Sequence, residues 1–130
     1  TEVLASRGLM FCGLSRTEVD YADASVLRDW MRFERPRFLI NAAGYTGKPN
    51  VDACENHKAE CLMGNAVLPG RMREVCEELG VPWGHVSSGC TYSGRRPDGG
   101  GWLETDVPNF SFQSPPCSFY SGTKALGEEV

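Results

Sequence analysis

The chain has 130 residues, enough for one domain with a hydrophobic core, and its 13 basic and 17 acidic residues give a net charge of −4. This balance provides no electrostatic basis for binding nucleic acid or an anionic membrane surface. No apolar run approaches the roughly 18 residues of a membrane span, and the N-terminus lacks the basic-then-apolar profile of a secretory signal. We therefore expect a soluble cytoplasmic protein without nucleic-acid or membrane partners.

Six cysteines are spread through the chain, at positions 12, 54, 61, 76, 90 and 117. They form no Cys-x-x-Cys pair and show no histidine-rich metal spacing. We expect reduced thiols, most of them small apolar core residues, and no metal site.

The first half of the chain alternates apolar runs with periodic segments. Residues 1–7 are typical of the tail of a helix, and the apolar run "LMFCGLS" at 9–15 predicts a strand. Residues 23–36 carry apolar side chains at helical spacing, with Asp23 or Ser25 as the N-terminal cap and a proline at the end.

The second half continues this alternation. Residues 37–44 predict a buried strand, 65–80 a helix that ends at a glycine, 81–88 a third strand, and 120–130 a helix without a stop signal. This order indicates an α/β fold with a parallel sheet covered by helices on both faces. The elements at both ends look incomplete, so we expect a segment of a longer protein.

Two long irregular segments, 44–58 and 93–118, each follow a predicted strand. Ligands bind at that edge of an open parallel sheet, so loops of this length are expected to be functional there. The alternative interpretation is a flexible surface excursion.

Tyr120 and Lys124 lie four residues apart in the stretch "SFYSGTK". On a helix this spacing places both side chains on one face, where a phenol and an ammonium can reach one substrate. Taken alone, the pattern is more often a half-exposed tyrosine beside a solvated lysine.

Five motifs change that interpretation when they are taken together. They are Asp20-Tyr21-Ala22-Asp23, Asn41-Ala42-Ala43-Gly44, Asn65, Ser88, and the pair Tyr120 and Lys124. In this order they resemble the extended short-chain dehydrogenase/reductases that act on nucleotide sugars. The resemblance implies a Rossmann-type doubly wound parallel sheet. It also implies that residues 1–130 form one partial NAD(P)-binding domain, lacking the first strand and the C-terminal substrate domain.

A narrower likeness lies in the stretches "NAAGYTGKPNVDACENHK", "SSGCTY" and "FYSGTKALGEE". They are similar to the plant-type 3,5-epimerase/4-reductases of rhamnose synthesis. The dTDP-4-dehydrorhamnose reductases are similar as well, but usually carry Thr-Asp where this chain has Ser88-Gly89. The likeness implies NADP(H)-dependent reduction, with 3,5-epimerisation, of a nucleotide-linked 4-keto-6-deoxyhexose. The nucleotide, UDP or dTDP, is left open.

The resemblance also implies catalytic roles. Tyr120 would protonate the sugar oxygen, and Lys124 would favour the phenolate, because a free phenol keeps its proton to a pKa of about 10. Ser88 would fix the carbonyl oxygen by a hydrogen bond. GDP-fucose synthases have a cysteine two residues after their catalytic serine, where this chain has Cys90. That thiol is either an acid or base for epimerisation or an inert cysteine at a strand end.

The cofactor contacts that the resemblance implies are Ser15, Arg16, Asp20, Tyr21, Asn41, Ala42, Ala43, Gly44, Asn65, Tyr120 and Lys124. The strand predicted at 9–15 corresponds to the family's second strand. An arginine at its end accommodates the 2′-phosphate of NADP(H), whereas an acidic residue there holds the ribose of NAD(H). Ser15 and Arg16 favour NADP(H), and the nearby Glu18 and Asp20 keep NAD(H) as the alternative. The family's glycine-rich pyrophosphate turn is not among these residues, so we expect the isolated chain to be inactive.

Two other functions fit the same motifs. One is a ketoreductase without epimerase activity, in which Cys90 is inert. The other is a non-catalytic NADP-binding module, because the regulatory subunit of methionine adenosyltransferase resembles these reductases; the intact set Ser88, Tyr120 and Lys124 argues against it. The expected partners are a nucleotide-sugar substrate and a second copy of the protein, since many relatives dimerise through the helix that carries Tyr120.

Overall fold

The structure of the chain, a computed structural model, describes residues 2–130. In chain order its elements are α1 (Glu2–Ser6), α2 (Ala24–Glu34), β1 (Leu39–Asn41), η1 (Val51–Glu55), α3 (Lys58–Leu62), η2 (Met63–Val67), α4 (Leu68–Leu79), β2 (Trp83–His85), η3 (Gly89–Thr91) and α5 (Phe119–Glu129). Strands β1 and β2 pair in parallel, with Leu39 opposite Trp83 and Asn41 opposite His85. The predicted α/β class with a parallel sheet is confirmed.

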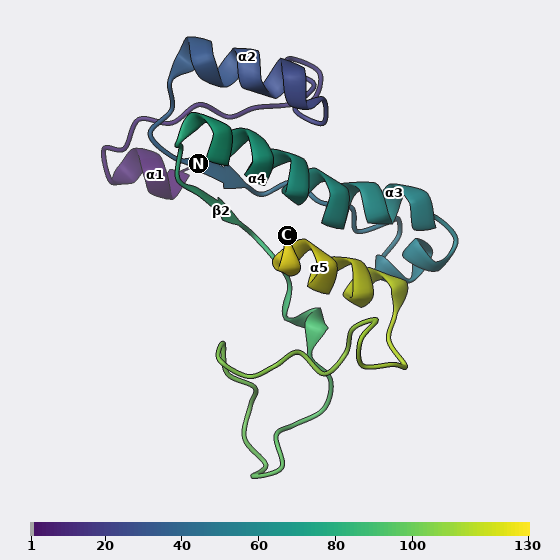
Figure 1. Cartoon of the computed structure of the whole chain (residues 1–130). Helices are drawn as coiled ribbons and strands as arrows, with labels where there is room; N and C mark the ends of the chain where they lie inside the picture. Colours follow the sequence, from purple (N-terminus) through teal and green to yellow (C-terminus); the bar gives the residue numbers. More distant parts are fainter. Residues whose placement is uncertain (1) are drawn as a thin grey trace.

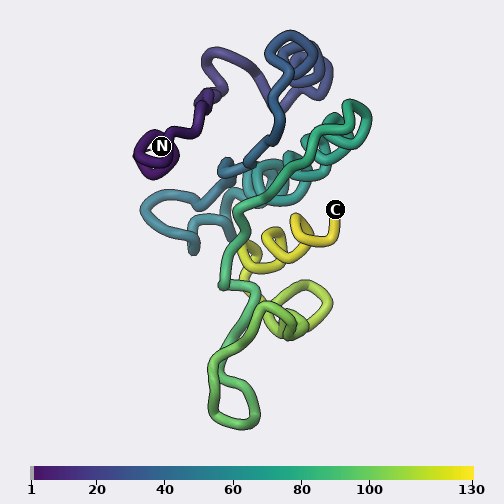
Figure 2. The backbone as a smooth tube through the Cα atoms, turned by 90° about the vertical axis from the view of Figure 1, so that its left-hand side faces the viewer, coloured from purple at the N-terminus to yellow at the C-terminus, as the bar shows by residue number. Residues whose placement is uncertain are grey.

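The helices form the body of the molecule, and one long segment extends away from it. Figure 1 shows α2 along one side of α4. Helix α5 lies on the opposite side of the run formed by α3 and α4. The chain between η3 and α5 projects from this body as an extended lobe, which is visible in both Figure 1 and Figure 2. None of the described helices is long and apolar enough to cross a bilayer.

Helix α2 begins where its capping residue predicts. The Asp23 carboxylate accepts hydrogen bonds from the backbone N–H groups of Ser25 (2.8 Å) and Val26 (3.3 Å), so Asp23 is the cap. The helix ends at Glu34, because Arg35 adopts a left-handed conformation with φ 49° before Pro36. Both ends follow from local sequence.

The helix predicted at 65–80 ends correctly at Gly80 but begins earlier than expected. Helical structure runs without a break from α3 through η2 to α4, so the start at residue 65 was wrong by seven residues. Element η2 is a π-helical turn, in which the N–H of Leu68 donates to the carbonyl of Met63. The first turns escaped prediction because Cys61 is the one buried residue of α3, which leaves no apolar period to detect.

The strand predicted at 9–15 is wrong: this run has no strand structure. Its apolar residues Leu9, Met10 and Phe11 are exposed. A strand exists by hydrogen bonding to a neighbour, and within residues 2–130 the strands β1 and β2 pair only with each other. The same lack of neighbours makes β1 and β2 shorter than the predicted 37–44 and 81–88.

Two buried clusters hold the elements together. The first, which we call the α2–α4 core, contains Leu27, Met31, Leu68, Met72, Val75 and Cys76. The second, the α3–α5 core, contains Cys54, Cys61 and Tyr120 and joins η1, α3 and α5. The division between them falls at η2.

The two faces of the sheet differ in their surroundings. Leu39 and Trp83 pack against the α2–α4 core, and Asn41 is buried on the same face. On the other face, which we call the open sheet face, Ile40 and Val86 are 58% and 55% exposed and Phe38 is also exposed. Within the described residues, helices therefore cover one face of the sheet.

Candidate active site at the strand ends

Lys124 joins the ends of the two strands. Its side chain is only 5% exposed, and Nζ donates a hydrogen bond to the carbonyl of Val86, 3.2 Å away and just beyond β2. A methyl group placed on Gly44, beyond the end of β1, would lie 3.6 Å from the same Nζ. Burial lowers the pKa of Lys124, and the nearby carboxylate of Glu128 acts against this shift. The predicted ammonium is thus held between the two strand ends.

Tyr120 lies one turn before Lys124 on α5. The helix starts at Ser118, whose hydroxyl accepts the N–H of Ser121 at 3.1 Å, and this cap fixes the turn that carries Tyr120. The tyrosine ring is buried against Cys54 and Cys61. Among residues 2–130 its hydroxyl has no hydrogen-bond partner, so the oxygen is available to a ligand.

Ser88 and Cys90 belong to η3, which packs against α5. The Ser88 hydroxyl accepts the N–H of Cys90 at 3.2 Å and caps η3. The Cys90 side chain is exposed. Within the described residues neither side chain hydrogen-bonds to Tyr120. The structure therefore places Ser88 and Cys90 against α5, the helix that carries Tyr120, without a direct hydrogen bond.

Asn65 ties the loop after β1 to α5. It is fully buried; its Oδ1 accepts the N–H of Tyr45 at 2.8 Å, and its Nδ2 donates to the Tyr45 carbonyl at 2.9 Å and to the Thr123 hydroxyl at 3.2 Å. Asn65 was expected to open a helix. It lies instead inside the π-helical turn η2. Thr123, which also donates to the Tyr120 carbonyl at 2.8 Å, was missed because a buried threonine carries no distinct sequence signal.

The turn after β1 leaves its backbone open to solvent. The Asn41 side chain accepts the N–H of Ala43 at 3.0 Å and folds the chain back, while Ala42 and Gly44 are exposed. A methyl group on Gly44 would approach Asn65 Oδ1 to 3.1 Å, so glycine permits this close packing. The turn is thus packed closely against η2 on its inner side.

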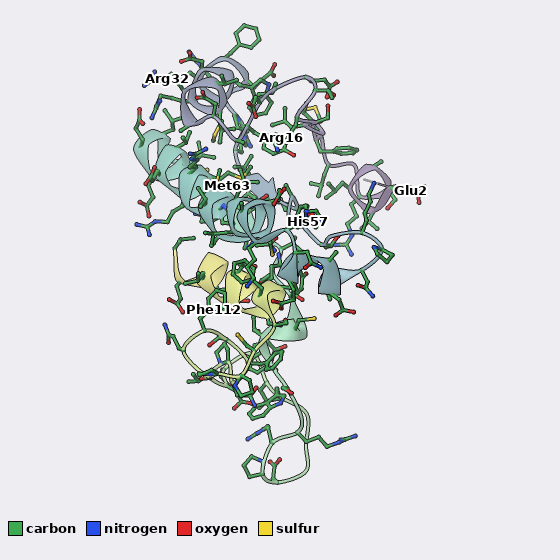
Figure 3. The ribbon with its side chains drawn as sticks, turned by 90° about the vertical axis from the view of Figure 1, so that its right-hand side faces the viewer. Glu2, Arg16, Arg32, His57, Met63 and Phe112 are labelled. Atoms are coloured by element: carbon green, nitrogen blue, oxygen red, sulfur yellow. The ribbon has the colours of Figure 1, made fainter. Side chains whose placement is uncertain are left out.

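A cavity of about 470 Å³ lies beside two of the predicted cofactor contacts, Arg16 and Asp20. Arg16, Asp20, Asp23, Met63 and Arg71 contribute to its lining, and Figure 3 labels Arg16, in the loop before α2, and Met63, in η2. Arg71, which the sequence did not single out, donates from Nη1 to the Ala22 carbonyl at 2.6 Å. The cavity thus holds two guanidinium groups together with the carboxylates of Asp20 and Asp23.

The other residues predicted to contact the cofactor serve local structure. The Ser15 hydroxyl donates to the Glu18 carboxylate at 2.6 Å, and Arg16 pairs with Asp20 at 3.6 Å. Tyr21 packs against the α2–α4 core. Of these contacts, the pair of Arg16 and Asp20 forms part of the wall of the cavity.

A family model described as the RmlD substrate binding domain matches residues 1–130. The chain belongs to the RmlD family. Two relatives from Arabidopsis thaliana are named for rhamnose synthesis. The first, the trifunctional UDP-glucose 4,6-dehydratase/UDP-4-keto-6-deoxy-D-glucose 3,5-epimerase/UDP-4-keto-L-rhamnose-reductase, is 39% identical over 111 residues, 82% of this chain. The second, the bifunctional dTDP-4-dehydrorhamnose 3,5-epimerase/dTDP-4-dehydrorhamnose reductase, is 40% identical over 100 residues, 74% of this chain. This RmlD family chain spans 16% and 32% of the length of these two relatives.

Solved structures share the fold of this RmlD family chain. The L780 UDP-rhamnose synthase from Acanthamoeba polyphaga mimivirus matches with a TM-score of 0.80 at 23% identity, covering 98% of this chain and 45% of that one. A dTDP-4-dehydrorhamnose reductase from Bacillus anthracis, solved in complex with NADP, matches with a TM-score of 0.74 at 22% identity, covering 98% of this chain and 42% of that one. The suspected family and fold are confirmed, whereas the roles of individual residues stay predictions.

Proposed function

We propose that the protein carrying this chain is an NADP(H)-dependent reductase, with 3,5-epimerase activity, that acts on a nucleotide-linked 4-keto-6-deoxyhexose in rhamnose-type sugar synthesis. The observation that carries the proposal is the position of Lys124, buried between the ends of β1 and β2 with its Nζ bonded to Val86. This site lies at the carboxyl edge of a parallel sheet, where ligands bind in open α/β folds. The names of the relatives supply the substrate class.

The residues present fit a dinucleotide. In this proposal the solvent-exposed turn at Ala42 to Gly44 lies against the nicotinamide ring, Lys124 bonds the nicotinamide ribose, and Arg16 and Arg71 bind a phosphate in the cavity that Asp20 and Asp23 also line. When bound, NADPH supplies the hydride for reduction. Residues 1–130 are, in this proposal, one partial NAD(P)-binding Rossmann domain, and NAD(H) is the alternative cofactor.

The side chains of this chain would then donate and accept the protons of the reaction. Tyr120, its oxygen available to a ligand, donates the proton to the sugar oxygen, and the charge on Lys124 favours the phenolate that remains. Ser88 bonds the sugar carbonyl and fixes its orientation. Epimerisation needs proton exchange at the carbon atoms beside the ketone, and the exposed thiol of Cys90 serves as the acid or base on one face.

The wider setting follows from the same proposal. The six cysteines are free thiols, which a cytoplasmic enzyme keeps reduced. The second partner, another copy of the protein bound through α5, stays a prediction.

The test is turnover by the full-length protein. We would supply UDP- or dTDP-4-keto-6-deoxyglucose with NADPH or NADH in deuterated water. Nicotinamide absorbance reports reduction, and deuterium at C3 and C5 of the sugar reports epimerisation. We expect oxidation of NADPH together with label incorporation, and a fall in rate of about 100-fold or more for Tyr120→Phe.

The cysteine variants separate the alternatives. Cys90→Ser should abolish label incorporation, while Cys12→Ser, which changes another exposed thiol, should leave it intact. Oxidation without label in the unaltered protein would leave a simple ketoreductase. Tight binding of NADPH without oxidation would favour the regulatory module and contradict the proposal.

A further inference from the structure

His85 and Asn41 face each other across the sheet, directly before the turn that lines the candidate site. They are register partners in β2 and β1, and Asn41 Nδ2 lies 3.1 Å from His85 Nδ1. The Asn41 side chain is buried, with 2% of its surface exposed. The Asn41 side of the contact is therefore shielded from water, which strengthens the hydrogen bond.

The neighbouring backbone fixes which atom donates. Asn41 Oδ1 accepts the N–H of Ala43, and rotating the amide would place two donors against each other there. Nδ2 must therefore point at His85, and because Nδ2 can only donate, His85 Nδ1 must accept. An imidazole that accepts at Nδ1 is neutral and carries its proton on Nε2.

The other ring nitrogen supports the same arrangement from the opposite side. His85 Nε2 is buried and has no hydrogen-bond partner within residues 2–130. It faces the packing of α5, since a methyl group on Gly127 would lie 3.6 Å from it. Leaving Nε2 without a hydrogen bond costs free energy. Within the described residues the ring hydrogen-bonds to the Asn41 side chain, and this contact therefore determines its position.

We propose that His85 is a positioning residue, which as the neutral Nε2–H tautomer holds the Asn41 side chain and through it the turn at Ala42 to Gly44. This inference rests on the proposed function for its consequence, because that turn lines the cofactor site. The assignment of the tautomer does not depend on the proposed function, because it follows from the hydrogen bonds alone.

Acid should release this contact. Protonation adds a hydrogen to Nδ1, which then meets the Nδ2 hydrogens of Asn41. The groups that influence the ring are Lys124 of α5, which lowers the pKa of His85, and Glu128 of α5 and the backbone of Asn41 in β1, which act against that shift. On α4, the thiol of Cys76 is uncharged because burial raises its pKa.

The sign of the pH effect follows from the shift of the histidine. Burial, and after it the charge of Lys124, lowers the pKa of His85 below its usual value of 6.5. The unfolded chain therefore binds this proton first as the pH falls. The stabilisation by neutral His85 is complete above pH 6.5 and is lost between that value and the lowered pKa of the folded protein.

The experiment compares two replacements in the full-length protein. His85→Asn keeps an acceptor oxygen near the position of Nδ1, whereas His85→Leu has a similar size and no acceptor. We expect the Kd for NADPH, from quenching of nicotinamide fluorescence, to rise about tenfold for His85→Leu and to change less than about threefold for His85→Asn. Equal binding by the two variants would overturn the proposal.

A second measurement needs no cofactor. Nitrogen-15 NMR of the histidine side chains, with His85 assigned by its loss in His85→Asn, should show a proton on Nε2 and a bare Nδ1 at pH 7.5. Asn41→Asp, which presents only acceptors, should move the proton to Nδ1. A proton on Nδ1 in the unaltered protein would contradict the inference even if His85→Leu fails to fold. Failure of the unaltered protein to bind NADPH would instead count against the proposed function.

Discussion

Lys124 is a charged group that the fold buries at a cost. Its folded pKa is lowered by burial, so the unfolded chain binds the proton more tightly, and folding becomes more favourable as the pH rises toward the usual lysine pKa. At neutral pH the buried ammonium therefore opposes folding. Such a residue is retained for what the charge does in the site.

Replacing the charge should separate stability from activity. Lys124→Met keeps the length of the side chain, and we expect turnover to fall about 100-fold or more while the melting temperature at pH 7 stays level or rises. Any gain should shrink as the pH is raised, because the lysine then loses its proton. Melting curves at several pH values, together with the turnover assay, provide the measurement.

A matched variant controls for the loss of any lysine. Lys48→Met changes an exposed lysine in the loop after β1 and should alter neither property. A Lys124→Met protein that retains most of its turnover would contradict the assignment of Lys124.

Sequence located some residues of the site and missed others for definite reasons. Tyr120 and Lys124 were singled out because their spacing places them on one face of a helix and because the other motifs of the family resemblance accompany them in order. His85 and Arg71 were missed because their partners, Asn41 and Ala22, lie far away in the chain and pair only in the folded molecule.

At the scale of elements, Gly127 sets the distance between α5 and η2. A methyl group on this glycine would overlap the carbonyl oxygen of Asn65, which belongs to the backbone of η2 and cannot easily move. Gly127→Ala should therefore push the two elements apart and lower the free energy of unfolding by about 1–3 kcal/mol. Urea denaturation of the two proteins provides the measurement.

Gly70 offers the opposite case in another helix. It lies in α4, and a methyl group there would make only ordinary contact with Val130, at 3.7 Å. Gly70→Ala should raise the free energy of unfolding by about 0.5–1 kcal/mol, since alanine is the better helix former. Equal effects of the two variants would show that α5 and η2 are not in close contact.

Helices that depend on nearby residues could be predicted from the sequence, whereas a strand depends on a partner that is distant in the sequence. Helix α2 was foreseen because its cap and apolar face lie within a dozen residues of sequence, whereas the Ser118 cap of α5 was not predicted. The run at 9–15 was predicted as a strand from its composition, but strand formation depends on a neighbour that no local pattern supplies.

For the whole molecule, the open sheet face is the main liability. Apolar side chains at Phe38, Ile40 and Val86 lie in water on adjacent strands, and exposed patches of this kind bind apolar dyes. In the 130-residue chain, Ile40→Thr with Val86→Thr should reduce the fluorescence of bound anilinonaphthalene sulfonate at least about twofold, because threonine keeps the strand propensity and removes apolar surface.

The lobe provides the comparison for that experiment. Val107→Thr removes another exposed apolar side chain, from the segment between η3 and α5 and away from the sheet. Its fluorescence should match that of the unaltered chain. A similar decrease in both variants would locate the dye elsewhere.

The π-helical turn η2 has a consequence for how the sequence of this molecule can change. It adds one residue to the helical run between α3 and α4, where the N–H of Leu68 reaches back to Met63. The helix before it supplies Cys61 to the α3–α5 core, and the helix after it supplies Met72 to the α2–α4 core. Deleting one residue from η2 would rotate one half by about 100° against the other and take both cores out of register. The length of this turn therefore keeps the two cores in register with each other.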